Sequence, residues 1–228
     1  MSLNNVEEIA TFIVADGKGI LAADESNPTC GKRFDSIGVD STEENRRDYR
    51  ELLFRSKGMK GNIGGVILFD ETIRQEAKDG TLLRDIISDQ GALPGIKVDK
   101  GLQPIEDCPN ETVTVGLDGL DERLKEYSSM GAKFTKWRAV INIGNGIPTD
   151  RCIDANMQAL ADYAKCAQDN GMVPIVEPEV LMDGEHNIDE CYEATERSLK
   201  SLFSHLEKAS VNIKGTLLKP NMVTSGKD

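Results

Sequence analysis

The sequence predicts an α/β protein of the TIM (β/α)8 barrel type, with only about six of the eight βα units present in the 228 residues. Strand-like and helix-like segments alternate about every 40 residues, which is typical of repeated βα units and a parallel sheet. The glycine fingerprint of a doubly wound dinucleotide-binding sheet is absent from the first strand-to-helix turn. Charged residues stand near the carboxyl ends of several strands, where TIM barrels carry their functional groups.

The strands are expected in six short apolar segments, each bounded by Gly or Pro. These segments are 19–26, 63–70, 95–99, 134–141, 173–180 and 215–222. Two shorter helices are expected at 81–89 and 119–130.

Three longer helices carry start or stop signals. Ser41 and Glu44 predict a capping box before a helix that Gly58 ends. Asp150 precedes a helix that ends near Gly171, with an apolar stripe at Ile153, Met157, Leu160 and Ala164. The third helix is expected at 188–209, and its buried side is predicted to comprise Cys191, Ala194, Leu199, Leu202, Phe203 and Leu206.

Five of the six strands direct at least one charged side chain along one face near the carboxyl end, because residues two apart in a strand share a face. The set is formally neutral, and it comprises Lys97, Lys136, Arg138 and Lys219 against Asp24, Asp99, Glu177 and Glu179. Isolated charges are prohibitive inside a barrel, whereas a balanced and hydrogen-bonded network is tolerated. The pattern therefore predicts a charged site at one end of the barrel.

This mixture of lysines and carboxyl groups can support chemistry that needs no cofactor. Burial and a second nearby cation lower the pKa of a lysine, and the neutral amine attacks a carbonyl to form a Schiff base. The proton transfers need a carboxyl group, for which Glu177 and Asp24 are candidates. A histidine-rich metal site is poorly supported because the chain has only His186 and His205.

The composition excludes several classes of partner. The formal net charge is −12, which is the wrong sign for a protein that binds the phosphate backbone of nucleic acid. No apolar run approaches the roughly 20 residues that a membrane span needs. The first residues are acidic where a secretory signal would be basic, so we expect a cytoplasmic protein without nucleic-acid or membrane partners.

Eight motifs along nearly the whole chain carry a resemblance to a known family. They are GKGILAADES, STEENRRDYRELLF, GGVILFDET, GIKVDKG, GLDGL, KWRAV, VPIVEPEVL and GTLLKPNMV. In order and spacing they resemble the class I (Schiff-base) fructose-bisphosphate aldolases. The resemblance implies a TIM barrel that cleaves fructose 1,6-bisphosphate reversibly to dihydroxyacetone phosphate and glyceraldehyde 3-phosphate, without a metal or cofactor and as a homotetramer or homodimer.

The resemblance also implies a role for individual residues. Lys219 would be the Schiff-base nucleophile, and Glu177 would be the acid and base for carbinolamine dehydration. Lys136 would stabilise developing charge and lower the pKa of Lys219, and Asp24 would position or deprotonate the C4 hydroxyl of the substrate. The implied substrate or phosphate contacts are Ser26, Thr29, Arg33, Lys97, Arg138 and Glu179, of which Glu179 also supports Glu177.

Two features depart from the family pattern. Ser26, Asn27, Pro28 and Thr29 stand where many members have Ser-Thr-Gly-Ser, although Thr29 can still donate a hydroxyl to phosphate. A complete barrel needs eight βα units in about 250 residues. We therefore expect residues 1–228 to form a single aldolase-type domain that is truncated after its sixth strand.

Three other functions stay open at this point. Another lysine-dependent barrel, such as transaldolase or a deoxyribose phosphate aldolase, would share the chemistry, but the order of the motifs weighs against it. A metal-dependent aldolase would need three histidines for its zinc ion, and the chain has two. A non-catalytic aldolase-like scaffold or interaction protein would keep the surface without turnover.

Overall fold

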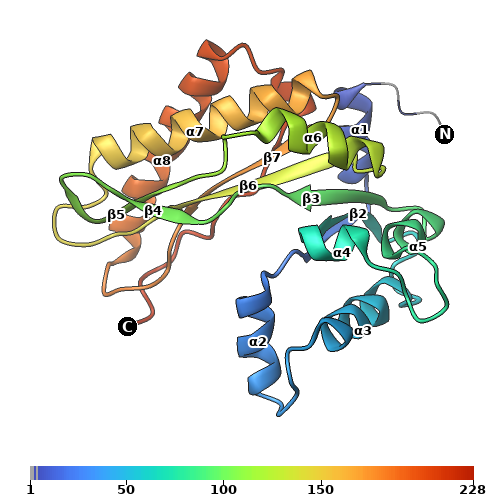
Figure 1. Cartoon of the computed structure of the whole chain (residues 1–228). Coiled ribbons are helices and arrows are strands. Elements are labelled where there is room, and N and C mark those ends of the chain that lie inside the picture. Colours follow the sequence, from blue (N-terminus) through green and yellow to red (C-terminus); the bar gives the residue numbers. More distant parts are fainter. Residues whose placement is uncertain (1–2, 4) are drawn as a thin grey trace.

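The computed structural model describes residue 3 and residues 5–228. Its main sheet has six parallel strands in the order β1-β2-β3-β6-β7-β8, with helices along its outer side, as in part of a TIM barrel (Figure 1). The strands are β1 (Gly19–Ala23), β2 (Ile63–Leu68), β3 (Leu93–Lys97), β6 (Phe134–Ile141), β7 (Val173–Val180) and β8 (Leu217–Leu218). All six predicted strands are confirmed, although several are shorter than expected.

The helices are α1 (Val6–Ile13), α2 (Asn27–Asp35), α3 (Glu43–Phe54), α4 (Asp70–Arg74), α5 (Leu83–Asp89), α6 (Leu120–Ser129), α7 (Asp150–Asp169) and α8 (Ile188–Lys208), with a short 3₁₀ turn at Ile213–Gly215. In Figure 1, α6, α7 and α8 lie along one side of the sheet, while α2 and α3 project from the other end of the molecule. An antiparallel pair, β4 (Leu102–Ile105) and β5 (Cys108–Thr114), lies outside the main sheet. The sequence patterns did not predict this pair, nor α1, α2 and α4.

For two helices, the predicted cap lies one residue away from the observed cap. Helix α3 is capped by Thr42, whose Oγ1 accepts a hydrogen bond from Asn45 N at 3.1 Å, and not by Ser41. Both positions carry a hydroxyl, but Thr42 has the extended backbone that a cap requires. Helix α7 is likewise capped by Thr149, so Asp150 is its first residue.

The predicted buried sides of the two longest helices are largely confirmed. The α7 stripe is buried throughout, and Cys191, Ala194, Leu202 and Leu206 are buried on α8. Phe203 was wrongly assigned to the buried side, because 43% of the residue is exposed. It follows Leu202 directly and therefore lies about 100° around the helix, off the apolar stripe.

The interior face of the sheet is closed at its amino-terminal end by α1. Ile9, Ala10 and Ile13 of α1 pack with the strand residues Ile20, Ile67, Phe134, Val173, Ile175 and Leu217 in one apolar cluster. Trp137 and Val176 belong to a second, larger core with the outer helices. The predicted alternation of strand faces is therefore confirmed.

The aromatic ring of Phe134 fills the floor of this interior. An added Cβ would lie 2.7 Å from the ring at Gly65 and 2.3 Å from it at Gly95, distances that no side chain tolerates. The two glycines on β2 and β3 are thus required by the close approach of one ring.

In the described part of the chain, no helix is both long enough and apolar enough to cross a membrane.

Candidate active site

Four of the predicted catalytic residues come together at the carboxyl ends of the strands. Lys136 Nζ lies 2.9 Å from Glu177 Oε2 and 3.1 Å from Asp24 Oδ2. Lys219 Nζ forms an ion pair with the other oxygen of the same carboxylate, Glu177 Oε1. Glu177 is therefore shared by two lysines, and Lys136 bridges Glu177 and Asp24.

The strands position these side chains through their register. Lys136 on β6 is paired with Ile175 on the adjacent strand β7. Glu177 lies two residues beyond Ile175, so its side chain points to the same face of the sheet as that of Lys136. Lys219 directly follows β8, and its backbone N–H donates to Val176 O at 3.0 Å. Asp24 directly follows β1.

The buried part of the cluster keeps Lys136 positively charged. Only 8% of the Lys136 side chain and 4% of the Glu177 side chain are exposed, compared with 48% for Lys219. Burial lowers the pKa of Lys136, but the carboxylates of Asp24 and Glu177 outweigh burial and raise the pKa above its ordinary value. Lys136 is thus a fixed cation, and Lys219 is the lysine that a ligand can reach.

Ser26 and Thr29 lie next to each other, with their hydroxyl oxygens 3.0 Å apart. Pro28 stands in the first turn of α2, where a missing N–H costs no helical hydrogen bond. Ser26 and Lys97 both line a cavity of about 700 Å³ together with residues of α4 and α6, and Lys97 Nζ lies 3.0 Å from Asp99 Oδ1. The structure thus brings these two predicted phosphate contacts to one cavity, while their role stays a prediction.

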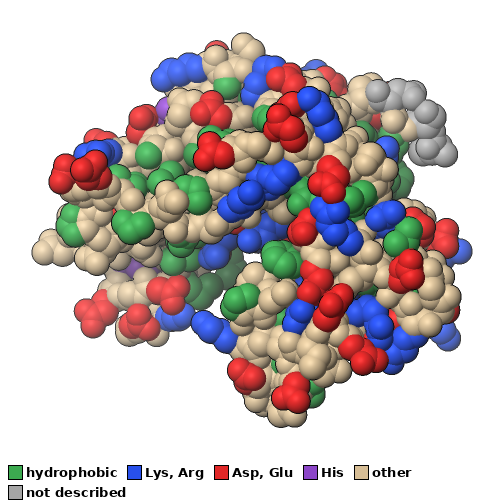
Figure 2. Space-filling view, in the orientation of Figure 1, with side chains coloured by type: hydrophobic (Ala, Val, Ile, Leu, Met, Phe, Trp, Pro, Cys, Tyr) green, Lys and Arg blue, Asp and Glu red, His purple; other side chains and the backbone are tan. Residues whose placement is uncertain are grey.

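The other two predicted cationic contacts have carboxylate partners. Arg138 pairs with Glu179, and both side chains are partly exposed. Arg33 on α2 pairs with Glu25 and is 58% exposed, so the structure does not bring it to the Lys219 cluster. Figure 2 shows Lys and Arg side chains in the hollow between the α2 lobe and the main body. Their roles as substrate contacts stay predictions.

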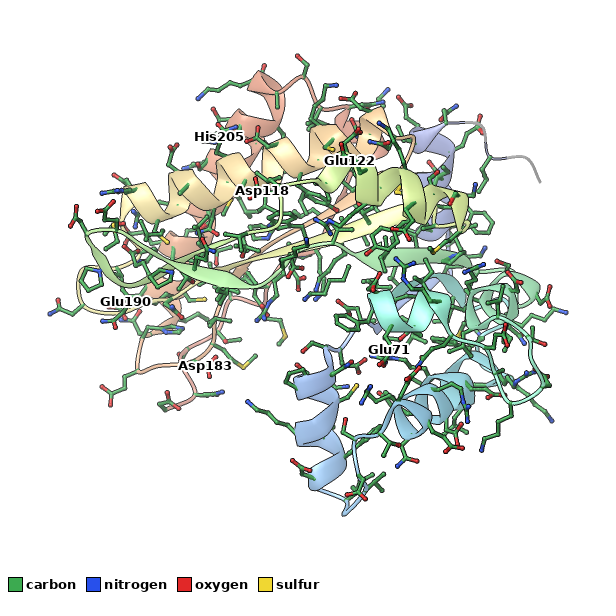
Figure 3. All side chains as sticks on the ribbon, in the orientation of Figure 1. Glu71, Asp118, Glu122, Asp183, Glu190 and His205 are labelled. Atoms are coloured by element: carbon green, nitrogen blue, oxygen red, sulfur yellow. The ribbon has the colours of Figure 1, made fainter. Side chains whose placement is uncertain are left out.

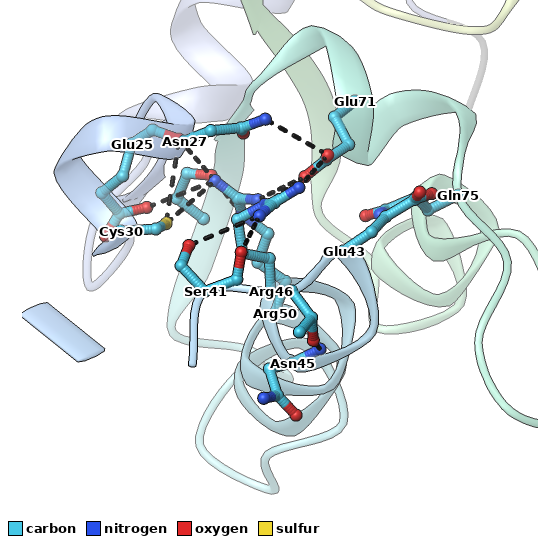
Figure 4. Close-up of polar contacts among 12 residues, drawn as sticks. Glu25, Asn27, Cys30, Ser41, Glu43, Asn45, Arg46, Arg50, Glu71 and Gln75 are labelled. Carbon is cyan, nitrogen blue, oxygen red and sulfur yellow. Dashed lines mark hydrogen bonds and ion pairs between the residues drawn. The ribbon is translucent and has the colours of Figure 1, made fainter. Parts of the chain in front are cut away.

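A second buried charged cluster, which the sequence patterns did not predict, lies behind Asp24. Arg46 on α3 makes two hydrogen bonds to Glu71 on α4, at 2.8 Å and 2.5 Å, and the fully buried Arg50 lies one turn further along α3 (Figure 4). Figure 3 shows Glu71 on the side of α4 that faces α3. A signal was present, because Arg46, Arg50 and Phe54 recur every four residues on the buried stripe of this helix.

The Arg46 pairing has a clear electrostatic consequence. The hydrogen bonds from Arg46 lower the pKa of Glu71 below its ordinary value, and the nearby charge of Arg50 adds to this effect. Burial of the Cys30 thiol raises its pKa, although Arg50 opposes the rise.

In the described residues, no group of three His, Cys, Asp or Glu side chains is arranged so that it could hold a metal ion.

The arrangement around Lys219 suits imine chemistry. An accessible amine, a carboxyl group in contact with it, a fixed cation and a second carboxylate are the groups that Schiff-base formation and later proton transfers require.

Comparison with known proteins identifies the family of the chain. Residues 5–228 match the family model described as "Fructose-bisphosphate aldolase class-I", of the glycolytic type. The chain is 56% identical to a probable fructose-bisphosphate aldolase class 1 of Xanthomonas campestris, covering 100% of this chain and 68% of that protein. It is 52% identical to the cytosolic fructose-bisphosphate aldolase 4 of Arabidopsis thaliana, covering 96% of this chain and 56% of that protein.

A solved structure agrees with the sequence relatives. The fructose-bisphosphate aldolase of Plasmodium falciparum, in a ternary co-crystal with TRAP and a small-molecule inhibitor, superposes with a TM-score of 0.96 at 48% identity. The superposition covers 97% of this chain and 65% of that one. The chain therefore spans between 56% and 68% of the length of the relatives named here. The chain belongs to the class I fructose-bisphosphate aldolases, a family of lyases.

Proposed function

We propose that the protein cleaves fructose 1,6-bisphosphate reversibly to dihydroxyacetone phosphate and glyceraldehyde 3-phosphate through a Schiff base on Lys219. The observation that carries this proposal is the shared carboxylate: Glu177 contacts the amine of Lys219 on one oxygen and the buried cation of Lys136 on the other. Family membership supplies the substrate class.

Formation of the imine uses Lys219 and Glu177. The neutral amine of Lys219 adds to the C2 carbonyl of the substrate and gives a carbinolamine. Glu177 donates a proton to the carbinolamine hydroxyl, which leaves as water and gives the iminium ion. This proton comes from the ammonium group of Lys219, which contacts Glu177 Oε1 and becomes the neutral amine when Glu177 takes the proton.

Cleavage then requires a base at the C4 hydroxyl, and Asp24 fills this role. Asp24 takes the hydroxyl proton and the C3–C4 bond breaks. The electron pair of that bond forms the C2=C3 double bond of an enamine, while the π pair of the C=N bond moves to the iminium nitrogen. Glyceraldehyde 3-phosphate leaves. Protonation of the enamine at C3 and hydrolysis of the imine release dihydroxyacetone phosphate and regenerate Lys219. Lys136, held between Asp24 and Glu177, stabilises negative charge during these steps.

The remaining predicted residues would bind the two phosphates and the sugar hydroxyls. Ser26, Thr29 and Lys97 provide hydroxyl and ammonium donors on one side, and Arg138 with Glu179 provides a charged pair on the other. We propose that Arg33 exchanges Glu25 for a substrate phosphate. We also propose a single domain across 1–228, a cytoplasmic location like that of the cytosolic relative, and a homotetramer or homodimer.

Borohydride reduction in the presence of dihydroxyacetone phosphate, followed by peptide mass mapping, tests the proposal. The expected result is a reduced triose phosphate adduct on Lys219 alone, and none in a Lys219→Arg variant. An adduct on another lysine, or none in the wild-type protein, would overturn the mechanism. Cleavage should also persist in EDTA, whereas a loss of activity would favour a metal-dependent reaction.

A further inference from the structure

We propose that Arg50 is a positioning residue for Asp24: its guanidinium holds the backbone on both sides of Asp24 and so aims the Asp24 carboxylate at the substrate. This inference rests on the proposed function, in which Asp24 is the base for C3–C4 cleavage. Among the described residues, Arg50 makes no hydrogen bond or ion pair with Lys136 or Lys219.

The contacts of Arg50 bracket Asp24 in the chain. Arg50 Nε donates a hydrogen bond to the carbonyl oxygen of Ala23 at 3.2 Å, and Nη2 donates to the carbonyl oxygen of Glu25 at 2.6 Å. One planar side chain therefore fixes the peptide group that precedes Asp24 and the one that follows Glu25. The Asp24 carboxylate projects the other way, to Lys136 Nζ at 3.1 Å.

This support falls where regular structure ends. The pairing of β1 with β2 runs to Ala23, and α2 begins at Asn27, so Asp24, Glu25 and Ser26 form the connection between strand and helix. Buried carbonyl groups need a donor when no neighbouring strand supplies one. Arg50 supplies that donor from α3, which is a different element of the fold.

Arg50 is itself fully buried in the second cluster. Its side chain is 0% exposed, its Nη1 lies 3.7 Å from Glu71 Oε1, and its Nη2 lies 3.9 Å from Glu25 Oε2 and 3.6 Å from Cys30 Sγ (Figure 4). Among the described residues, Nη1 has no hydrogen-bond partner of its own. Glu71 is neutralised mainly by Arg46, through two hydrogen bonds. The shortest contact of Arg50 is thus to the backbone beside Asp24, and not to a carboxylate.

Arg46 binds a carboxylate, whereas Arg50 binds two backbone carbonyl groups. This difference argues against a purely structural role for Arg50. A buried charge costs several kcal/mol of desolvation, and an apolar side chain of similar volume often serves stability equally well. A lysine could not replace Arg50, because its point charge cannot reach two carbonyls at fixed angles. The planar fork of a guanidinium fits this task.

The consequence is specific to one step of the reaction. Imine formation requires Lys219 and Glu177, whereas C3–C4 cleavage requires Asp24 as well. A displacement of a reacting group by about 1 Å can cost about 10²-fold in rate. Loss of Arg50 should therefore slow cleavage while Schiff-base formation continues.

The test compares Arg50→Lys with the matched control Arg46→Lys, which changes the same residue type on the same helix face one turn away. For Arg50→Lys we expect kcat for fructose 1,6-bisphosphate cleavage to fall about 10²-fold, with KM little changed. The yield of borohydride-trapped adduct on Lys219 should stay within about twofold of wild type. Arg46→Lys should keep kcat within about threefold.

A second measurement makes the result independent of activity. Amide hydrogen exchange, followed by mass spectrometry on peptides covering 20–30, should be about tenfold faster in Arg50→Lys than in Arg46→Lys. Equal exchange in the two variants, or equal losses of trapping and cleavage in Arg50→Lys, would overturn the positioning role. If the wild-type protein forms no adduct, the proposed function fails, and the exchange rates still decide whether Arg50 holds this segment.

Discussion

The protein contains two buried clusters of charge that differ in the cation they use. The cluster at the strand ends joins Lys136 and Lys219 through Glu177, and one of its amines is 48% exposed. The cluster behind Asp24 joins Arg46 and Arg50 to Glu71, and neither of its guanidinium groups is more than 9% exposed. The first cluster opens to a ligand, while the second is packed between α3, α4 and the connection that follows β1.

The difference shows how one fold separates reactivity from rigidity. A lysine is a flexible point charge that can lose its proton and act as a nucleophile. An arginine stays charged and binds planar groups through a rigid fork. Substitutions in the first cluster should therefore change the rate of the reaction, and substitutions in the second should change stability or geometry.

The largest effect is expected from Glu177→Gln in the first cluster. This substitution removes the group that transfers protons to and from the carbinolamine, so kcat/KM should fall about 10²- to 10⁴-fold. Steady-state cleavage assays measure this loss, and circular dichroism confirms that the variant is folded. A kcat/KM within tenfold of wild type would contradict the assignment of the first cluster to the reaction.

The second effect is a loss of stability in Arg46→Met. This change leaves the Glu71 carboxylate with a 3.4 Å hydrogen bond from Asn27 and with the more distant cation of Arg50. Breaking a buried pair costs about 3 kcal/mol or more. We expect the lower end because 18% of the Glu71 side chain is exposed. Urea unfolding measures the loss. The comparison would fail if this variant unfolded like wild type but lost its activity.

The third effect is a change in the acid dependence of stability in Glu71→Gln. Because hydrogen bonds from Arg46 hold the folded pKa of Glu71 below its ordinary value of 4.5, its contribution to stability is present above that value. The contribution is lost as pH falls through the lower, folded pKa. Between about pH 5 and pH 2, the free energy of unfolding should thus decrease less in the variant than in wild type. Parallel curves would show that Glu71 does not carry this acid sensitivity.

The smallest effect on stability is expected from Arg138→Gln. Arg138 and Glu179 form a partly exposed pair, and such pairs contribute about 0 to 1 kcal/mol. The same change should raise KM for the bisphosphate several-fold if Arg138 binds substrate. Thermal unfolding and saturation kinetics on one preparation separate the two. A large stability loss without any rise in KM would assign Arg138 to the fold instead.

The sequence predicted the elements whose signals are local. Short apolar segments bounded by Gly or Pro located the six strands, and helical stripes located α7 and α8. The four-residue cluster around Glu177 was predictable because strand alternation and the parallel order of the strands place such side chains on one face. Helix α1 was not predicted because its 8 residues give only a short helical pattern, although Asn5 caps this helix.

Long-range contacts account for what was missed at the site. Arg50 lies 25 residues from the carbonyl of Glu25 that it binds, and Glu71 lies 25 residues from Arg46. No periodicity reports which backbone group a buried arginine meets. Similarly, Arg33 pairs with Glu25 eight residues earlier, because α2 turns it toward that side chain and away from the strand ends.

Phe134 has a consequence for how this sequence can drift over evolutionary time. Its ring takes the room that side chains at Gly65 and Gly95 would otherwise fill, so three positions on three strands share a single volume. Relatives with a larger residue at either glycine should carry a smaller one in place of the phenylalanine, and single exchanges should be rare. The three positions are expected to evolve as a linked set.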